Sequence, residues 1–380
     1  MNIAVFISFI FICIAFSIIE YYNNKSIKIF SLIAIIFFVL LVTFRSKSTP
    51  DTTAYINYFE SISTDIWSTY SSFSNYWESE IGYTLLNQFI KSNFGNNYKI
   101  LFTIIPIINL AFIYSASKNI SSMIFKESFA LDISHNELKT KRKKQRFLLF
   151  MPLFALYVSY YGFMYSGIVL RAGLAISILI FAYSKILQGR YILGLLFSVV
   201  SIAFHQTAII GILAILFTFI KFKTKKSMYY FIWLILGLIY ISKIWIYFAP
   251  LISNYVQIYL FATESKTMSL FSEYLDIEIF FYSYSYMVLI MLVNVFISIR
   301  YIKETDTFRS LLNISLFGLT LLVLFGSITI FSRVTDFFTV FNFLLFYFAL
   351  NNMNSKLYKS IFISWIIITN SIFFYRLAGG

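Results

Sequence analysis

Long runs of apolar residues, separated by short polar segments, organise the chain from end to end. A helix needs about 20 mostly apolar residues to cross the hydrocarbon core of a membrane. Runs of roughly that length fall at 2–19, 27–44, 99–117, 147–165, 168–185, 228–249, 279–299, 310–330, 335–350 and 359–376. The pattern therefore predicts an all-α polytopic integral membrane protein in which each run forms a helix.

One further run, at 191–220, is 30 residues long. As a single helix it would measure about 45 Å at 1.5 Å per residue, which is more than one upright crossing requires. His-Gln-Thr at 205–207 interrupts the run and leaves two shorter apolar halves. We therefore predict a short helical hairpin at 191–220 and about twelve hydrophobic passes in the whole chain.

The distribution of positive charge favours the hairpin and predicts the orientation. Lysine and arginine collect in the short cytoplasmic loops of membrane proteins. With the N-terminus outside and a hairpin at 191–220, 21 of the 30 lysines and arginines lie in inward-facing segments, namely 20–28, 118–146, 185–190, 221–227, 300–309 and 351–359. A single crossing at 191–220 would instead reverse the side of every later basic segment.

Two predicted outer loops, 45–98 and 250–278, are long and rich in tyrosine, serine and asparagine. In the first, the apolar spacing from Ile81 through Leu85 to Phe89 predicts an amphipathic helix at the membrane interface. Residues 118–146 form the basic cytoplasmic loop. Because no repeat or linker divides the chain, residues 1–380 are predicted to form a single membrane domain.

Composition narrows the classes of function. The chain is 59% hydrophobic and 12% charged, against about 25% charged residues in soluble proteins. The net charge of +14 is explained by the predicted orientation and would attract the protein to anionic lipid, so no nucleic-acid partner is expected.

One cysteine, Cys13, and two histidines argue against a disulfide framework and against a cysteine or multi-histidine metal centre. The first run lacks a basic n-region and a cleavage site, so we interpret it as retained.

Few polar residues interrupt the apolar runs, and the predicted orientation places all of them at the outer ends of helices. They are Arg45, Asp51, Arg171, His205, Gln206, Arg333 and Asp336. An arginine as deep as Arg171 costs a few kcal/mol and needs an anionic partner or a polar cavity, unless its guanidinium reaches the lipid headgroups. The shared face of these residues indicates one outer site.

The side chains in this group suit an anionic ligand. Guanidinium binds phosphate through two parallel hydrogen bonds and keeps its charge, so three arginines around one cavity would fit a lipid diphosphate. His205 either transfers a proton near neutral pH or has a structural role, and Arg333 with Asp336 also has the spacing of an i,i+3 ion pair. The chain has no nucleotide-binding or hydrolase motif, which argues against a nucleotide-activated donor.

Five stretches occur in an order that resembles a known family. They are "FRSKSTPDTTAYINYF" at 44–59, "ESEIGYTLLN" at 78–87, "LRAGLAISILIFAYSKI" at 170–186, "FHQTAII" at 204–210 and "FSRVTDFF" at 331–338. This order is similar to the EpsG-like branch of the Wzy-type bacterial polysaccharide polymerases, which serve O-antigen, capsule and exopolysaccharide synthesis. Ala172 departs from the family, which often has glutamine there, and so do Ser48 and Thr49, where glycine is common.

The resemblance implies a metal-independent membrane glycosyltransferase of GT-C-like architecture, without a cofactor, at the periplasmic face of the cytoplasmic membrane. Its donor would be a glycan on undecaprenyl diphosphate, and its acceptor a lipid-linked repeat unit. A chain-length regulator and a flippase are the expected protein partners. The rival functions are a flippase for the same lipid-linked oligosaccharide, an O-antigen ligase and a membrane acyltransferase.

Roles follow for the candidate residues if the chain is such a polymerase. Arg171 and Arg333 are expected to hold the diphosphate, and Arg45 either joins them or holds Asp51 in place. His205 is the favoured base and Asp51 the other candidate. The expected substrate-binding residues also include Gln206, Asp336, Tyr55 and Tyr83, with the tyrosine rings either stacking on sugars or forming an interfacial belt.

Overall fold

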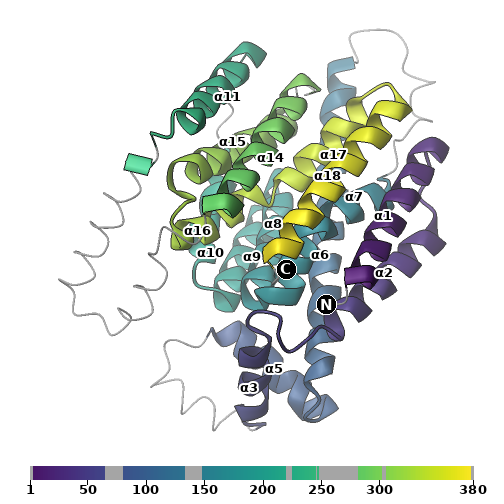
Figure 1. Cartoon of the computed structure of the whole chain (residues 1–380), viewed down its shortest axis with the longest axis vertical. Helices are drawn as coiled ribbons and strands as arrows, with labels where there is room; N and C mark the ends of the chain where they lie inside the picture. Colours follow the sequence, from purple (N-terminus) through teal and green to yellow (C-terminus); the bar gives the residue numbers. More distant parts are fainter. Residues whose placement is uncertain are drawn as a thin grey trace. The chain divides into compact units, whose positions relative to one another are not determined.

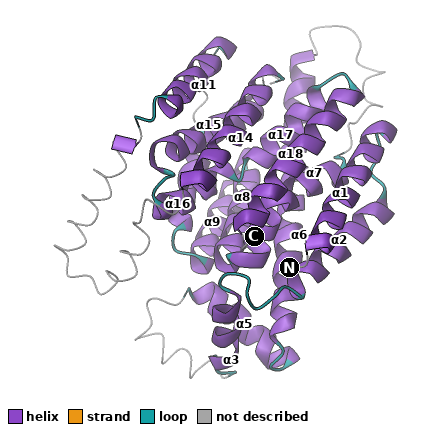
Figure 2. Ribbon diagram, viewed as in Figure 1, coloured by secondary structure: helices purple, strands orange, loops and turns teal. Residues whose placement is uncertain are grey.

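A computed structural model describes residues 3–64, 80–132, 148–219, 225–244, 246–247, 281–301 and 305–377. Within these ranges the regular structure is helical and no strand is found (Figure 2). The chain forms two compact units, one of Met1–Ile215 with Met353–Gly380 and the other of Leu216–Asn352. The single membrane domain expected from the sequence stays a prediction.

The described helices have the length and composition of those in a polytopic membrane protein. Six of them are long and apolar enough to cross a membrane, at Ile3–Asn23, Tyr98–Ser128, Leu170–Leu187, Asp306–Phe325, Arg333–Asn352 and Lys356–Tyr375. Shorter apolar helices occupy Lys28–Thr43, Tyr191–Phe204, Lys226–Ile241 and Tyr284–Arg300. Large apolar side chains such as Phe11, Ile192 and Val199 are exposed, as expected for surfaces that face lipid. The total of about twelve passes and the GT-C-like architecture stay predictions.

The first unit is built around α8 (Leu170–Leu187), which packs against α6 (Tyr98–Asp132) and α9 (Tyr191–Phe204). A second group in this unit places α1 (Ile3–Asn23) against α2 (Lys28–Thr43), α7 (Phe150–Tyr157) and α18 (Lys356–Leu377). Both groups are labelled in Figure 1. The packed apolar helices of this unit therefore hold its polar residues in position.

Glu20 ties the helices of the second group together. Its buried carboxylate accepts the Ile27 backbone N–H at 2.7 Å, before α2, and the Met151 backbone N–H at 2.9 Å, in the first turn of α7. Ser26 donates a further hydrogen bond at 3.2 Å. Since the first N–H groups of a helix have no partner within the helix, this one carboxylate satisfies donors at the starts of two helices.

The run at 191–220 is interrupted where the sequence predicts. Helix α9 ends at Phe204 and α10 (Ala208–Leu216) begins three residues after His205. His205 has an extended backbone that cannot continue the helix, and its carbonyl accepts the Ala208 N–H at 2.9 Å. The polar tripeptide therefore forms the connection between two short apolar helices.

The two runs predicted at 147–165 and 168–185 are joined almost directly. Helix α7 continues into two π-helical segments, η2 (Val158–Gly162) and η3 (Met164–Ile168), and α8 starts after a single residue, Val169. At Gly173 a Cβ atom would lie 2.0 Å from the Tyr165 carbonyl oxygen. Only glycine permits this close approach, so it determines how the first turn of α8 sits against η3.

Two short helices of the predicted outer loop cover one end of α6 and α8. Helices α3 (Thr52–Ser61) and α5 (Ile81–Phe94) contact each other and both contact α6. The predicted amphipathic helix is α5: Ile81, Leu85 and Phe89 are exposed, whereas its opposite face carries buried Tyr83 and Asn87. Its apolar stripe thus faces away from the protein, as expected for a helix lying at a membrane interface.

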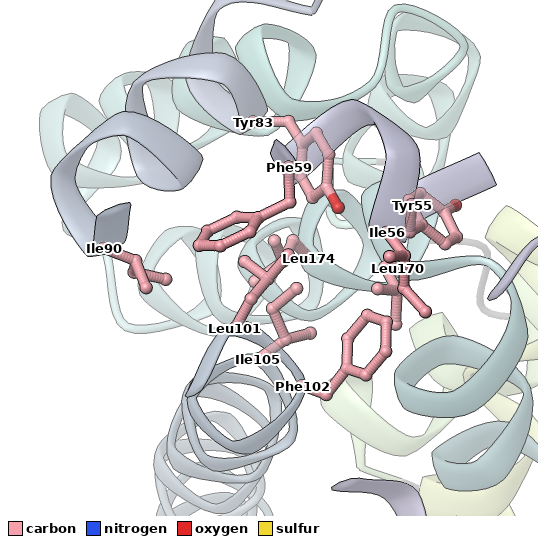
Figure 3. Close-up of a cluster of buried hydrophobic side chains, with 10 residues drawn as sticks. All are labelled: Tyr55, Ile56, Phe59, Tyr83, Ile90, Leu101, Phe102, Ile105, Leu170 and Leu174. Carbon is pink, nitrogen blue, oxygen red and sulfur yellow. The ribbon is translucent and has the colours of Figure 1, made fainter. Parts of the chain in front are cut away.

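The apolar contacts under α3 and α5 form one buried cluster, drawn in Figure 3. Side chains of α3 and α5 meet side chains of α6 and α8 there, and the cluster comprises Tyr55, Ile56, Phe59, Tyr83, Ile90, Leu101, Phe102, Ile105, Leu170 and Leu174. Burying an aromatic or aliphatic side chain contributes about 1.5–3 kcal/mol. The cluster therefore fixes the two short helices over the N-terminal end of α8.

The second unit contains α11 (Lys226–Ile241), α14 (Phe281–Arg300), α15 (Asp306–Phe325), α16 (Thr329–Thr339) and α17 (Asn342–Asn352). The run predicted as one span at 335–350 lies within the candidate span Arg333–Asn352, in which a turn separates the end of α16 at Thr339 from the start of α17 at Asn342. Of the predicted loops, 250–278 lies outside the described residues. Residues 118–132 of the basic segment continue α6 as helix, and 133–146 lie outside the described residues.

Candidate functional site

Glu80 joins Arg171 to His205 at one end of the first unit. Its Oε2 atom lies 3.2 Å from Nη1 of Arg171, and its Oε1 atom contacts Nδ1 of His205. The Glu80 side chain is only 6% exposed, whereas those of Arg171 and His205 are 42% and 26% exposed. A buried carboxylate thus holds a cation and an imidazole that both reach the surface.

Three helices meet to form this arrangement. Glu80 immediately precedes α5, Arg171 is in the first turn of α8, and His205 directly follows α9. At Gly82 a Cβ atom would lie 3.0 Å from the carbonyl oxygen of Ala203. The start of α5 can therefore lie directly against the last turn of α9, which brings Glu80 within reach of His205.

Tyr55 provides a second contact to Arg171. Its hydroxyl interacts with the Arg171 side chain, and its ring packs edge-on against that of Tyr83 at 5.8 Å between centroids. Burial raises the pKa of the Tyr55 hydroxyl, and the nearby Arg171 charge opposes that rise in part. The Tyr55 hydroxyl is therefore uncharged at neutral pH, and Arg171 is held from two sides.

The structure places two of the tyrosine rings in the buried core. Tyr55 is 8% exposed and Tyr83 is 2% exposed, and both belong to the buried cluster of Figure 3. A ring inside the core has no face left to stack on a sugar. Tyr55 contributes its hydroxyl to the site, and the two packed rings form a rigid base next to Arg171.

Arg45 is built into the wall beside this cluster. Its Nε donates to Oγ1 of Thr52 at 3.0 Å, its Nη1 donates to the Val42 carbonyl at 3.2 Å, and its guanidinium lies 3.6 Å from the Phe102 ring centroid. Burial lowers the pKa of Arg45 to about 10, which leaves it charged at neutral pH. Within the described residues its Nη2 is buried without a hydrogen-bond acceptor.

Asp51 does not pair with Arg45, so the expectation that the arginine holds it in place is wrong. Asp51 is exposed, has a left-handed backbone with φ of 61°, and makes no side-chain cap for α3. Its carbonyl accepts the Tyr55 N–H at 3.0 Å. Thr52, the next residue, takes the arginine contact because its hydroxyl points into the protein, while the Asp51 carboxylate stays in solvent.

The remaining predicted residues divide between the two units. Gln206 follows His205 directly and is exposed. Arg333 and Asp336 lie on α16 in the second unit, so a cavity containing three arginines stays a prediction. Within the described ranges, no group of three or more His, Cys, Asp or Glu side chains is placed to hold a metal ion.

Glu80 is the residue that sequence reasoning missed. It is part of the family-like stretch at 78–87, in a polar segment of the sequence that contains other acidic residues, and it was given no role there. The available signal was indirect: an arginine in an apolar run needs an anionic partner, and Glu80 directly precedes the predicted amphipathic helix. Chemically, the group combines an anion-binding guanidinium with an imidazole oriented by a carboxylate.

Comparison with known proteins identifies one family. The model of the EpsG family matches residues 28–379, which covers every residue of the group described above. No curated protein and no solved structure matches the chain.

Proposed function

The chain belongs to the EpsG family, and we propose that it is a polysaccharide polymerase that joins undecaprenyl-diphosphate-linked oligosaccharide repeat units at the outer face of the cytoplasmic membrane. Family membership supports a polysaccharide polymerase-like role. The observation that carries the proposal further is the joining of Arg171 and His205 by buried Glu80. The polytopic fold suits a lipid-linked substrate, because such a substrate reaches its enzyme through the bilayer.

In the proposed reaction, the bond between the donor sugar's anomeric carbon and its diphosphate oxygen breaks. A glycosidic bond forms to a hydroxyl of the acceptor repeat, and the lipid diphosphate leaves. Negative charge grows on the diphosphate in the transition state, and donors placed beforehand around such charge supply a large part of catalysis. Arg171 is suited to this task because its guanidinium is held on Glu80 and Tyr55 yet is 42% exposed.

The acceptor hydroxyl must lose a proton, and His205 is the proposed base. Its side chain is partly exposed, and its Nδ1 contacts the Glu80 carboxylate. General-base catalysis of this kind typically contributes a factor of about 10²–10⁴. Exposed Asp51, before α3, is the second candidate. Gln206, Arg333 and Asp336 are proposed to bind other parts of the two lipid-linked substrates.

The orientation of the protein is part of the proposal. The excess of lysine and arginine in alternate polar segments supports an outside N-terminus, and with it an outer position for Glu80, Arg171 and His205. A lipid-linked repeat at that face has already crossed the membrane. In cells lacking this protein, a polymerase role predicts that the unpolymerised repeat accumulates in the outer leaflet. Accumulation in the inner leaflet would indicate a flippase instead.

Substitution of Arg171 tests the catalytic assignment. We expect Arg171→Ala to lower polymerisation by about 10²–10³-fold, the loss seen when one charge-stabilising donor is removed. Arg171→Lys should recover little activity, because it keeps the charge and loses the planar, paired donors. Chain length is measured on extracted glycan, with protein levels measured in the same membranes.

Arg190→Ala is the matched control, because it removes an exposed arginine from the connection between α8 and α9. This variant should make chains of wild-type length. Wild-type chain length in Arg171→Ala, at normal protein levels, would contradict the proposed role of Arg171.

A further inference from the structure

We propose that Glu80 is a positioning residue that holds the base and the anion-binding arginine in their working orientations at the same time. The inference rests on the proposed function, and it concerns a residue that touches neither substrate in that mechanism. Glu80 acts through its two oxygen atoms, of which Oε1 contacts His205 and Oε2 contacts Arg171.

The contact with His205 selects the form of the imidazole. A carboxylate oxygen accepts a hydrogen bond, so Nδ1 of a neutral His205 carries the hydrogen and the basic electron pair lies on Nε2. A carboxylate behind a histidine fixes ring orientation and tautomer in this way in many sites. Glu80 therefore determines which nitrogen of His205 can take the acceptor's proton.

The contact with Arg171 restrains the guanidinium group. Nη1 forms an ion pair with Oε2 of Glu80 at 3.2 Å, and the Tyr55 hydroxyl interacts with the same arginine. An arginine held at two points has lost its rotational freedom before the ligand binds, so binding costs less conformational entropy. Its exposed part can then receive phosphate oxygens without rearrangement.

The local structure of α5 gives no other reason for a glutamate at this position. Glu80 stands at the N-cap, where Ser, Thr, Asp and Asn are preferred because their short side chains bond to the first N–H groups. Its side chain makes no such bond and turns toward α8 and α9 instead. A buried charge is costly unless it is paired, and Glu80 has two partners. The pairing with Arg171 and His205 therefore accounts for a buried carboxylate here.

Kinetics of purified variants test the inference. Wild type, Glu80→Gln, His205→Ala and the double variant are compared in lipid nanodiscs, with the lipid-diphosphate-linked repeat as substrate. We expect Glu80→Gln to lower kcat by about 10–100-fold, the range for loss of an orienting partner, with KM changed less than about threefold. Because Glu80 acts through His205 as well as through Arg171, adding Glu80→Gln to His205→Ala should remove only the part that acts through Arg171, and so should lower kcat by less than it lowers that of wild type.

Two further variants complete the experiment. Glu60→Gln, on an exposed acid of α3, should match wild type. Glu80→Asp keeps the charge but is one methylene shorter, so it cannot span both partners and should also lower kcat. Glu80→Asp decides the matter if Glu80→Gln does not fold, as judged by thermal unfolding in the same nanodiscs.

Three results would overturn the inference while leaving the proposed function intact. They are a wild-type kcat in Glu80→Gln, a wild-type kcat in Glu80→Asp, and an equal loss from Glu80→Gln with and without His205. A wild-type protein that does not lengthen the lipid-linked repeat would instead refute the proposed function itself.

Discussion

Arg171 and Glu80 show which residues of a membrane protein can be found from sequence and which cannot. An arginine inside an apolar run is conspicuous because it is costly there, and the same cost predicts that it has a partner. Glu80 provides that partner at 3.2 Å, from a polar stretch about 90 residues earlier in the chain. Hydropathy carries no information on such a pairing, so the need for an anion was predictable and its identity was not.

Burial explains the other differences at the residue scale. Tyr55 and Tyr83 were plausible sugar-stacking residues because outer loops are usually exposed. In the structure, α3 and α5 fold back over α6, and both rings enter the core. Asp51 and Arg45 are close in sequence, yet Arg45 bonds Thr52 at 3.0 Å. Proximity along the chain was therefore a poor guide to contact.

Tyr55→Phe tests how much the second contact to Arg171 contributes. The ring still fills its place against Tyr83, so the fold should keep its stability, while Arg171 loses one of its two holders. A hydrogen bond to a charged group contributes about 1.5–3 kcal/mol, which corresponds to a loss in kcat of about 10–100-fold if it acts in the transition state. Steady-state kinetics and thermal unfolding of the purified variant measure the two effects.

Tyr98→Phe is the control for that change. Tyr98 begins α6 and packs, partly buried, against the same cluster, so it loses a hydroxyl that does not contact Arg171. It should retain wild-type kcat. A normal kcat in Tyr55→Phe would show that Glu80 alone is enough to hold Arg171.

At the scale of helices, the sequence predicted which helices exist better than it predicted which helices pack against each other. The break at His-Gln-Thr and the amphipathic helix α5 are confirmed, because a polar interruption and a 3.6-residue apolar period are visible locally. The π-helical segments between α7 and α8 were missed, and the 335–350 run, which lies within the candidate span Arg333–Asn352, has an unpredicted turn between α16 and α17. Both features lie in mostly apolar sequence, where no periodicity distinguishes one uninterrupted helix from a helix with a local break.

Close contacts at two glycines determine where the first turns of α5 and α8 lie at the site. The first turn of α5 touches α9 at Gly82, and the first turn of α8 touches η3 at Gly173. Neither contact could be predicted from the sequence, because the residues around a glycine in an apolar helix do not indicate which element packs against it. These two glycines position the helix starts that carry Glu80 and Arg171.

Gly82→Ala tests the α5–α9 contact. The added Cβ would lie 3.0 Å from a backbone oxygen of Ala203, so α5 must move away by a few tenths of an ångström. Overpacking of this kind costs about 1–3 kcal/mol, and it should separate Glu80 from His205. We expect a lower melting temperature and a several-fold lower kcat for the purified variant.

Gly237→Ala provides the comparison, because an added Cβ there meets nothing within 4 Å. Alanine is favoured over glycine inside a helix by about 0.5–1 kcal/mol, so this variant should be as stable as wild type or slightly more so, with unchanged kcat. Equal behaviour of the two variants would refute a tight α5–α9 contact.

For the molecule as a whole, the fold class was predictable because the bilayer requires it. Backbone groups in lipid must be hydrogen-bonded internally, so long apolar segments form helices, and six described helices meet the length and hydropathy of a membrane span. Charge asymmetry adds a predicted orientation. The family match over residues 28–379 then connects this architecture to polysaccharide synthesis, which hydropathy alone could not do.

The most direct test of the central claim is chain growth by the purified wild-type protein. The full chain is placed in lipid nanodiscs with the lipid-diphosphate-linked repeat as its only sugar substrate, and the products are separated by size while released lipid diphosphate is quantified. We predict a ladder of lengthening glycans, with one lipid diphosphate released for each bond formed and no nucleotide sugar required. No growth of the repeat, or growth only when a nucleotide sugar is added, would contradict the account.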